Sequence, residues 1–215
     1  MTDPTSPRER AKAFEALADA RRSVRRFSDA PVPEEVMRSA FRSAHLAPSS
    51  NNLQPWEFYW VRSGSPQRAK AVEACLSQPA AATSAELVFL IGRPDLLSDR
   101  AAAIVAHFEA EGNDGTASYY RDQVAHNVQK MAPEARNAWV DKSVALAAAQ
   151  FMLAIKAAGF DSCPMEGLDP DQVRALFDLP ADATVTMAIS VGEGIPEGLY
   201  GPRLRFPLAD HLHEY

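Results

Sequence analysis

The sequence predicts one globular domain that combines α-helices with β-strands. Residues 87–91 are a continuous apolar run ending at Gly92, which is typical of a central strand covered on both faces. Residues 144–159 are apolar nearly all round, which predicts a helix in a protein core or a subunit interface. A chain of 215 residues with 47% hydrophobic and 23% charged residues can bury such a core.

Two helices are predicted near the N-terminus. The first spans residues 6–20, because Ser6 and Glu9 have the spacing of a capping box. The second follows Pro33 and ends at His45, with apolar residues at helical spacing between them.

Between these helices, residues 21–27 carry a cluster of basic side chains and a hydroxyl: Arg21, Arg22, Ser23, Arg25 and Arg26. Guanidinium groups are permanently charged planar forks that match the oxygens of a phosphate monoester, and serine adds a short donor. The stretch therefore has two interpretations. It is an anion-binding site, or a basic helix C-terminus favoured by the helix dipole.

Residues 47–56 form a loop held between prolines. Within it, residues 49–54 contain three amides and two hydroxyls. Amides offer both donors and acceptors, which can match the edge of a flat heterocycle. Because Ser and Asn are also common turn residues, the loop is either a binding segment or an ordinary turn.

The middle of the chain predicts a strand at residues 57–61, which are rich in aromatic residues, and a helix at 66–76. Residues 94–141 are less regular, with helices expected at 98–111 and 119–131. A long insertion of this kind forms either a lid or pocket wall, or surface helices without a role.

Toward the C-terminus, Gly159 is expected to end the apolar helix, and residues 163–167 to be irregular. A helix is predicted to start at Asp169, and the third strand to span residues 184–191.

The tail contains a second basic group, Arg203 and Arg205. In an extended chain, residues two apart face the same side, so these guanidiniums would lie about 7 Å apart along the chain. They form either a second anion-binding group or an ordinary charged surface pair.

The net charge of −6 indicates that the basic clusters are local, so we expect a small-molecule partner and no nucleic acid. Cys75 and Cys163 lie far apart, which predicts reduced thiols in a cytoplasmic protein. Neither a signal sequence nor a run of ~20 apolar residues is evident, so no membrane is expected. No metal site is expected either, because the spacing of a ligand set is lacking in His107, His126, His211 and His213.

Four segments carry recognisable motifs: Arg21-Arg22-Ser23-Val24-Arg25 followed by Phe27; Pro48-Ser49-Ser50-Asn51-Asn52-Leu53-Gln54-Pro55-Trp56; Pro164-Met165-Glu166-Gly167; and Arg203-x-Arg205. In this order and at these distances, they resemble the FMN-dependent nitroreductase family of NAD(P)H-dependent oxidoreductases. The second motif matches almost residue for residue.

The resemblance implies an α+β subunit with a nitroreductase-like fold, in which a central, mostly antiparallel sheet is flanked by helices. It implies a single FMN-binding domain over residues 1–215. It also implies an intertwined homodimer with two FMN sites at the interface and the helix at 144–159 in the dimer core.

The resemblance also assigns cofactor-binding residues in three groups. The FMN phosphate and the pyrimidine end of the ring would be held by Arg21, Arg22, Ser23, Arg25, Arg203 and Arg205. The partner subunit would contribute Pro48, Ser49, Ser50 and Asn52. The third group is Pro164, Met165, Glu166 and Gly167, with the main chain of the last two against the flavin near N5. Gln78 and Ser143 stand where family members often carry other polar side chains.

By the same resemblance, hydride would pass from NADH or NADPH through flavin N5 to flat, electron-poor acceptors such as nitroaromatics or quinones. No side chain is assigned a catalytic role, and no Ser-His-Asp set or paired catalytic carboxylates are evident. The alternatives are another flavin chemistry on the same scaffold, namely flavin fragmentation, dehalogenation or dehydrogenation, or a flavin-holding protein without turnover.

Overall fold

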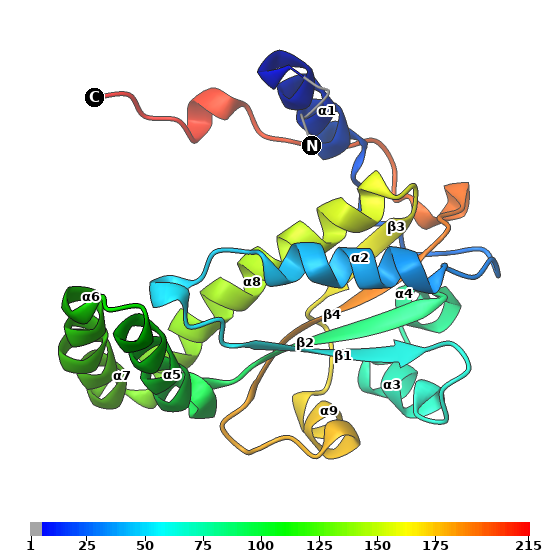
Figure 1. Cartoon of the computed structure of the whole chain (residues 1–215). Coiled ribbons are helices and arrows are strands. Elements are labelled where there is room, and N and C mark those ends of the chain that lie inside the picture. Colours follow the sequence, from blue (N-terminus) through cyan, green and yellow to red (C-terminus); the bar gives the residue numbers. More distant parts are fainter. Residues whose placement is uncertain (1–5) are drawn as a thin grey trace.

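A computed structural model describes residues 6–215, and at its centre lies a four-stranded sheet of order β1-β2-β4-β3 (Figure 1). The strands are β1 (Trp56–Arg62), β2 (Glu86–Gly92), β3 (Asp161–Met165) and β4 (Thr184–Gly192). Every neighbouring pair is antiparallel. The expected α+β class, with an antiparallel sheet flanked by helices, is confirmed.

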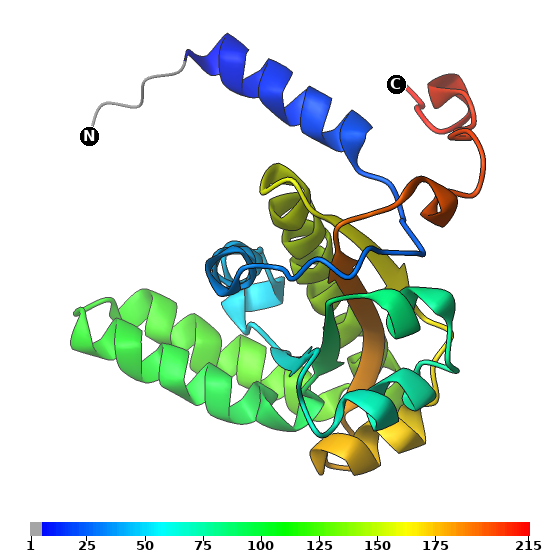
Figure 2. The ribbon, with the colours of Figure 1, turned by 90° about the vertical axis from the view of Figure 1, so that its right-hand side faces the viewer.

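Helices cover both faces of this sheet, as Figure 2 also shows. They are α1 (Pro7–Ala20), α2 (Glu34–His45), α3 (Arg68–Ala74), α4 (Pro79–Thr83), α5 (Leu97–Ala110), α6 (Asp114–Tyr119), α7 (Ala125–Lys130), α8 (Pro133–Ala157) and α9 (Pro170–Phe177). Alternation along β2 decides which helices each face meets. Val88 and Leu90 pack with α2 and α8, while Leu87 and Phe89 pack with α3, α4 and α9.

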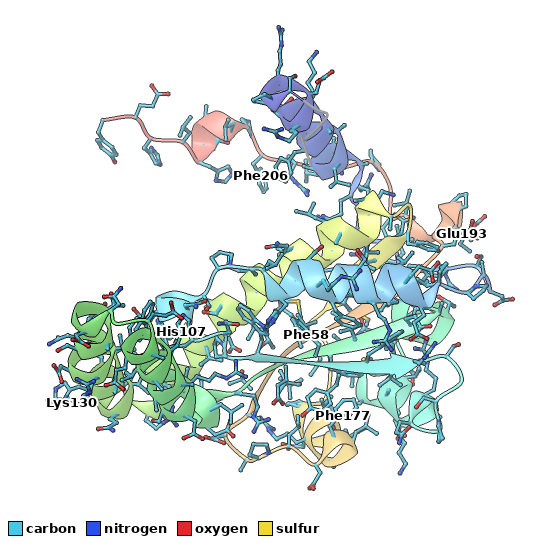
Figure 3. The ribbon with its side chains drawn as sticks, viewed as in Figure 1. Phe58, His107, Lys130, Phe177, Glu193 and Phe206 are labelled. Carbon is cyan, nitrogen blue, oxygen red and sulfur yellow. The ribbon has the colours of Figure 1, made fainter. Side chains whose placement is uncertain are left out.

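Aromatic pairs join the helices to both faces (Figure 3). Phe58 of β1 lies 5.7 Å, between ring centroids, from Phe41 of α2. On the other face, Phe177 of α9 lies 5.2 Å from Phe89 of β2. Since every residue of β2 is buried, the prediction of a central strand is confirmed.

Several helix boundaries follow the local signals in the sequence. The Ser6 hydroxyl accepts a hydrogen bond from the Glu9 amide, and the Glu9 carboxylate accepts one from the Ser6 amide, so the capping box is confirmed. Helix α2 ends at His45, as expected. Gly159 follows α8 at φ +89, a left-handed conformation that glycine adopts without steric cost.

The prediction of an irregular segment at residues 163–167 was wrong for its first half. Residues up to Met165 belong to β3, so the strand at 184–191 is the fourth strand and not the third. Pro164 and the small polar residues before it hide this strand in the sequence. Because β3 lies at the edge of the sheet, a proline without an N–H is tolerated there.

The predicted helix at 144–159 is the second half of α8, which begins at Pro133 and has 25 residues. It is the one helix within residues 6–215 that is long and apolar enough to cross a membrane. The side chains of Val144, Phe151 and Ile155 are fully buried in the core, as in the core helix of a globular protein. The face of α8 that points away from the sheet is not covered within the described chain, however, and Leu146 on this face is 49% exposed.

The region at 94–141 contains a cluster of helices beside one end of the sheet (Figure 1). The helix expected at 98–111 is α5. The one expected at 119–131 is divided into a π-helical segment, Tyr120–Val124, and α7. The short helix α4 had not been predicted, because its five residues carry no periodic pattern.

Helix α1 and the C-terminal tail both extend away from the sheet (Figures 1 and 2). No residue of α1 is buried, and Phe14 is 59% exposed. Phe206 in the tail, labelled in Figure 3, is 70% exposed. Within the described chain, these apolar side chains are uncovered.

Candidate functional site

Residues 21–27, here called the arginine segment, meet the C-terminal tail that carries Arg203 and Arg205. Together, at the C-terminal end of α1, they line a cavity of about 170 Å³. We call it the arginine cavity, and its lining residues are Arg21, Arg22, Ser23, Arg25, Tyr200, Pro202, Arg203, Leu204 and Arg205. The six residues that the family resemblance assigns to the FMN phosphate and the pyrimidine end are therefore brought together, whereas Arg26 does not line the cavity.

The arginine segment is extended and not helical. Arg21 already has φ −68 and ψ 127. The Val24 amide donates to the Ser162 carbonyl of β3 at 3.1 Å, and the Arg25 amide donates to the Gly198 carbonyl at 2.9 Å. Val24 is buried, whereas Arg21, Ser23 and Arg25 line the cavity, as alternation along an extended chain predicts. Arg22 lines the cavity as well, outside this alternation. The geometry favours an anion site over a basic helix terminus.

Hydrogen bonds from one arginine of the tail and one arginine of the segment hold the tail against the segment and the end of α1. Arg203 donates to the carbonyl oxygens of Asp19 and Arg21 at 2.5 and 2.6 Å. Arg22 donates back to the Gly201 carbonyl at 2.9 Å. By contrast, Arg205 is exposed. Within the described chain its guanidinium donates only to the adjacent Leu204 carbonyl, so the guanidinium is available to bind a ligand.

The arginine cavity concentrates positive charge. None of its described lining residues is acidic, and the nearest ion pair, Arg203 with Asp19, is long at 3.8 Å. Burial lowers the pKa of Arg21, and repulsion from Arg203 and Arg205 lowers it further. A bound anion would relieve this repulsion, and a small cavity lined by guanidiniums suits a phosphate group.

The second predicted group lies elsewhere. The segment 48–54, here called the amide loop, follows α2 and contains a 3₁₀ turn at Ser50–Asn52. The buried Leu53 anchors it to the core, and the Ser49 hydroxyl accepts a hydrogen bond from the Gln54 amide at 2.9 Å. Pro48, Ser50 and Asn52 are exposed, as an outward-facing binding surface requires.

None of the amide loop lines the arginine cavity. Its first residue, Pro48, instead lines a separate groove together with Phe14 and Leu17 of α1, and the ribbon views show the course of the loop after α2 (Figures 1 and 2). The structure therefore joins the two arginine groups within one chain but leaves the amide loop apart from them.

The third predicted group, residues 164–167, begins in the last part of β3 and continues past its end. Pro164 and Met165 belong to the strand, and the Met165 side chain is buried in the core, so only its main chain can face a ligand. Glu166 and Gly167 are exposed.

The two positions at which the sequence departs from the family motifs both contact predicted site segments. Gln78 donates from its side-chain amide to the Gly167 carbonyl at 2.5 Å and to the Cys75 carbonyl at 3.1 Å. Ser143, which is buried, accepts a hydrogen bond from the Ser50 amide at 3.5 Å.

Sequence reasoning missed Tyr200. Its ring lies under the Arg25 guanidinium, with 4.5 Å between the guanidinium carbon and the ring centroid. The only signal for Tyr200 in the sequence was its position shortly before Arg203 and Arg205. The histidines at 107, 126, 211 and 213 are exposed, and no group of three or more His, Cys, Asp or Glu side chains suited to a metal occurs within residues 6–215.

Comparison with known proteins agrees with this geometry. Residues 18–193 match the family model described as the nitroreductase family. The chain is 34% identical to an NADH dehydrogenase of Thermus thermophilus, covering 87% of this chain and 89% of that protein. It is 31% identical to the nitroreductase NfnB of Mycolicibacterium smegmatis, over 89% and 87% of the two chains.

A protein from Exiguobacterium sibiricum, solved in complex with FMN, superposes with a TM-score of 0.78 at 24% identity, over the whole of both chains. This likeness concerns the fold. Together with the family model and the sequence relatives, it identifies the chain as a member of the nitroreductase family of oxidoreductases.

Proposed function

We propose that this protein binds FMN and transfers hydride from NADH or NADPH to flat, electron-poor acceptors such as nitroaromatics or quinones. The observation that carries the proposal is the arginine cavity, whose size and charge fit a phosphate monoester. The names of the relatives, NADH dehydrogenase and nitroreductase, support the reductant and the reaction class. The FMN complex of the Exiguobacterium protein supports the choice of cofactor.

In this proposal, the cofactor phosphate and the pyrimidine end of the ring are held by Arg21, Arg22, Ser23, Arg25, Arg203 and Arg205. The chemistry that FMN supplies when bound is reversible hydride transfer at N5. The protein positions the cofactor, and cationic side chains near the pyrimidine end favour the anionic reduced ring. Because Gln78 hydrogen-bonds the Gly167 carbonyl, it orients the exposed main chain at Glu166 and Gly167 that would face N5.

The amide loop would complete the site from a second copy of the chain. A single chain exposes 12474 Å², whereas a folded monomer of 23.4 kDa exposes roughly 9,700 Å². A groove of about 470 Å³ between α1 and α8 is lined largely by apolar side chains, including Phe14, Leu146 and Leu153. A homodimer would cover this groove and bring Pro48, Ser49, Ser50 and Asn52 to the partner's cofactor.

We also propose a cytoplasmic location. Both cysteines are free and buried, which suits a reducing compartment.

The proposed reaction is tested by anaerobic mixing. Protein saturated with FMN is expected to lose its visible flavin absorbance with NADH or NADPH, and to regain it when a quinone or nitroaromatic is added. A protein that binds FMN but is bleached by neither nucleotide would be a flavin-holding protein, and the proposed turnover would be wrong. Failure to bind FMN at all would overturn the cofactor assignment.

A further inference from the structure

The main-chain carbonyls of the amide loop are held by two side chains from the helical cluster at 97–130. The Tyr120 hydroxyl donates to the Asn51 carbonyl at 2.8 Å. Arg100 of α5 donates to the Leu53 carbonyl at 3.4 Å and also to the Gln54 carbonyl. Three carbonyls of the loop, those of Asn51, Leu53 and Gln54, thus face this cluster.

The loop needs such support because its backbone is unusual. Asn51, Asn52 and Gln54 have φ values of 51, 52 and 46, which lie in the left-handed region. Asparagine tolerates this region, but each non-glycine residue held there has a conformational cost that its surroundings must offset. A loop with this backbone would relax toward other conformations if its external hydrogen bonds were removed.

Tyr120 is itself held firmly. It begins the π-helical segment, and its ring packs 5.9 Å from Phe108 and 5.7 Å from Tyr119, between centroids. π-Helical turns within α-helices are frequent at functional sites. A tyrosine hydroxyl is protonated at neutral pH, and burial raises the pKa of the Tyr120 hydroxyl further, so it is a hydrogen-bond donor there.

We propose that Tyr120 and Arg100 are positioning residues that hold the amide loop in the conformation that binds the flavin ring. This inference rests on the proposed function, because it takes the loop to be part of the FMN site. It gives the helical cluster a specific role. The cluster supports the main chain of the loop from behind, and neither Tyr120 nor Arg100 needs to touch the cofactor.

The test compares two neighbouring tyrosines and two ligands. Tyr120→Phe removes only the hydroxyl that bonds Asn51. Tyr119→Phe is the matched control, because Tyr119 is 52% exposed and its hydroxyl makes no hydrogen bond to the loop in the described chain. FMN and riboflavin affinities are measured by flavin fluorescence titration, and the melting temperature of each flavin-free variant is measured in parallel.

Since the loop meets the ring, both ligands should be affected alike. We expect Tyr120→Phe to weaken FMN and riboflavin binding equally, by about 3- to 10-fold, as for the loss of one hydrogen bond. Arg100→Met should weaken both ligands in the same way, and Tyr119→Phe should change neither. The flavin-free Tyr120→Phe protein should melt like the control variant.

Two outcomes separate this inference from the proposed function. If Arg21→Ala weakens FMN binding while Tyr120→Phe and Arg100→Met leave both ligands unchanged, the positioning role is wrong and the FMN site stands. If none of these variants changes FMN binding, the proposed site itself is wrong. A loss for Tyr120→Phe that is matched by a lower melting temperature and by the same loss in Tyr119→Phe would reduce the role of Tyr120 to general packing.

Discussion

At the scale of single residues, one extended segment places several arginines in the wall of a cavity. Val24 turns into the core while Arg21, Ser23 and Arg25 face the cavity. Arg26 belongs to the same run but is exposed and does not line the cavity. Arg22 has the same place in the alternation as Arg26 and still lines the cavity, so neither alternation nor basic composition alone distinguishes Arg26 from the arginines that line the cavity.

This difference predicts the effect of removing single guanidiniums. Arg205→Ala should weaken FMN binding about ten- to a hundredfold, because a hydrogen bond to a charged group contributes about 1.5 to 3 kcal/mol. Riboflavin, which has no phosphate, should be affected much less. Flavin fluorescence titration measures both affinities.

Arg26→Ala is the matched control for this experiment and should change neither affinity appreciably. Equal losses of FMN and riboflavin affinity in Arg205→Ala would contradict a phosphate contact and would point to a ring contact or to misfolding.

At the scale of elements, the packing of α8 on the sheet depends on a glycine at the end of β2. An added Cβ on Gly92 would lie 2.2 Å from the Thr184 hydroxyl oxygen and 2.6 Å from a methyl carbon of Val140. Thr184 also donates to Asp141 of α8 at 2.7 Å, so it cannot move without breaking that contact. Glycine is needed here because the helix and the neighbouring strand approach closely.

Gly92→Ala should therefore lower the free energy of unfolding by about 1 to 3 kcal/mol through overpacking. Gly64→Ala, where an added Cβ meets nothing within 4 Å, should change it by less than about 0.5 kcal/mol. Urea denaturation followed by circular dichroism measures both variants. Equal stability of the two would show that the close approach at Gly92 relaxes without cost.

At the scale of the whole molecule, most of the large exposed apolar side chains lie on the tail, with others on α1 and α8, although Leu46, Leu76 and Tyr119 are exposed elsewhere. The outer face of α8, the whole of α1 and the tail expose apolar side chains that include Phe14, Leu146 and Phe206. A stable dimer interface needs an apolar surface of this kind. In a symmetric dimer of two identical chains, the same surface of each chain forms the interface. The proposed homodimer therefore has a definite place on the molecule.

Light scattering is expected to give twice the chain mass of 23.4 kDa. Leu146→Glu should shift the protein toward the monomer and weaken FMN binding, because a charge on the outer face of α8 would be buried in the interface. Leu146 is half exposed in the single chain, so the variant should still fold.

Ala103→Glu places the same charge at an exposed position of α5 and serves as the control. It should remain a dimer with unchanged FMN affinity. A wild-type protein of monomer mass that still binds FMN tightly would contradict a site shared between subunits.

The sequence by itself determined those features that depend on near neighbours. The capping box of α1 and the end of α2 at His45 follow from contacts within a few residues, and the burial of β2 is written in a local run of apolar residues, so local patterns were sufficient to predict them. The four motifs also identified the family and nominated the arginines and the serine of the arginine cavity, although they could not show that these residues meet and did not include Tyr200.

Tertiary structure alone decided what depends on distant partners. Arg203 meets Asp19 across 184 residues, and Tyr120 meets Asn51 across 69, through main-chain carbonyls that every residue type carries. No side-chain pattern can reveal a bond to a carbonyl, so these contacts were invisible in the sequence. Likewise, Pro164 can belong to a strand only because β3 lies at the sheet edge, and strand order is set by long-range pairing and not by local propensity.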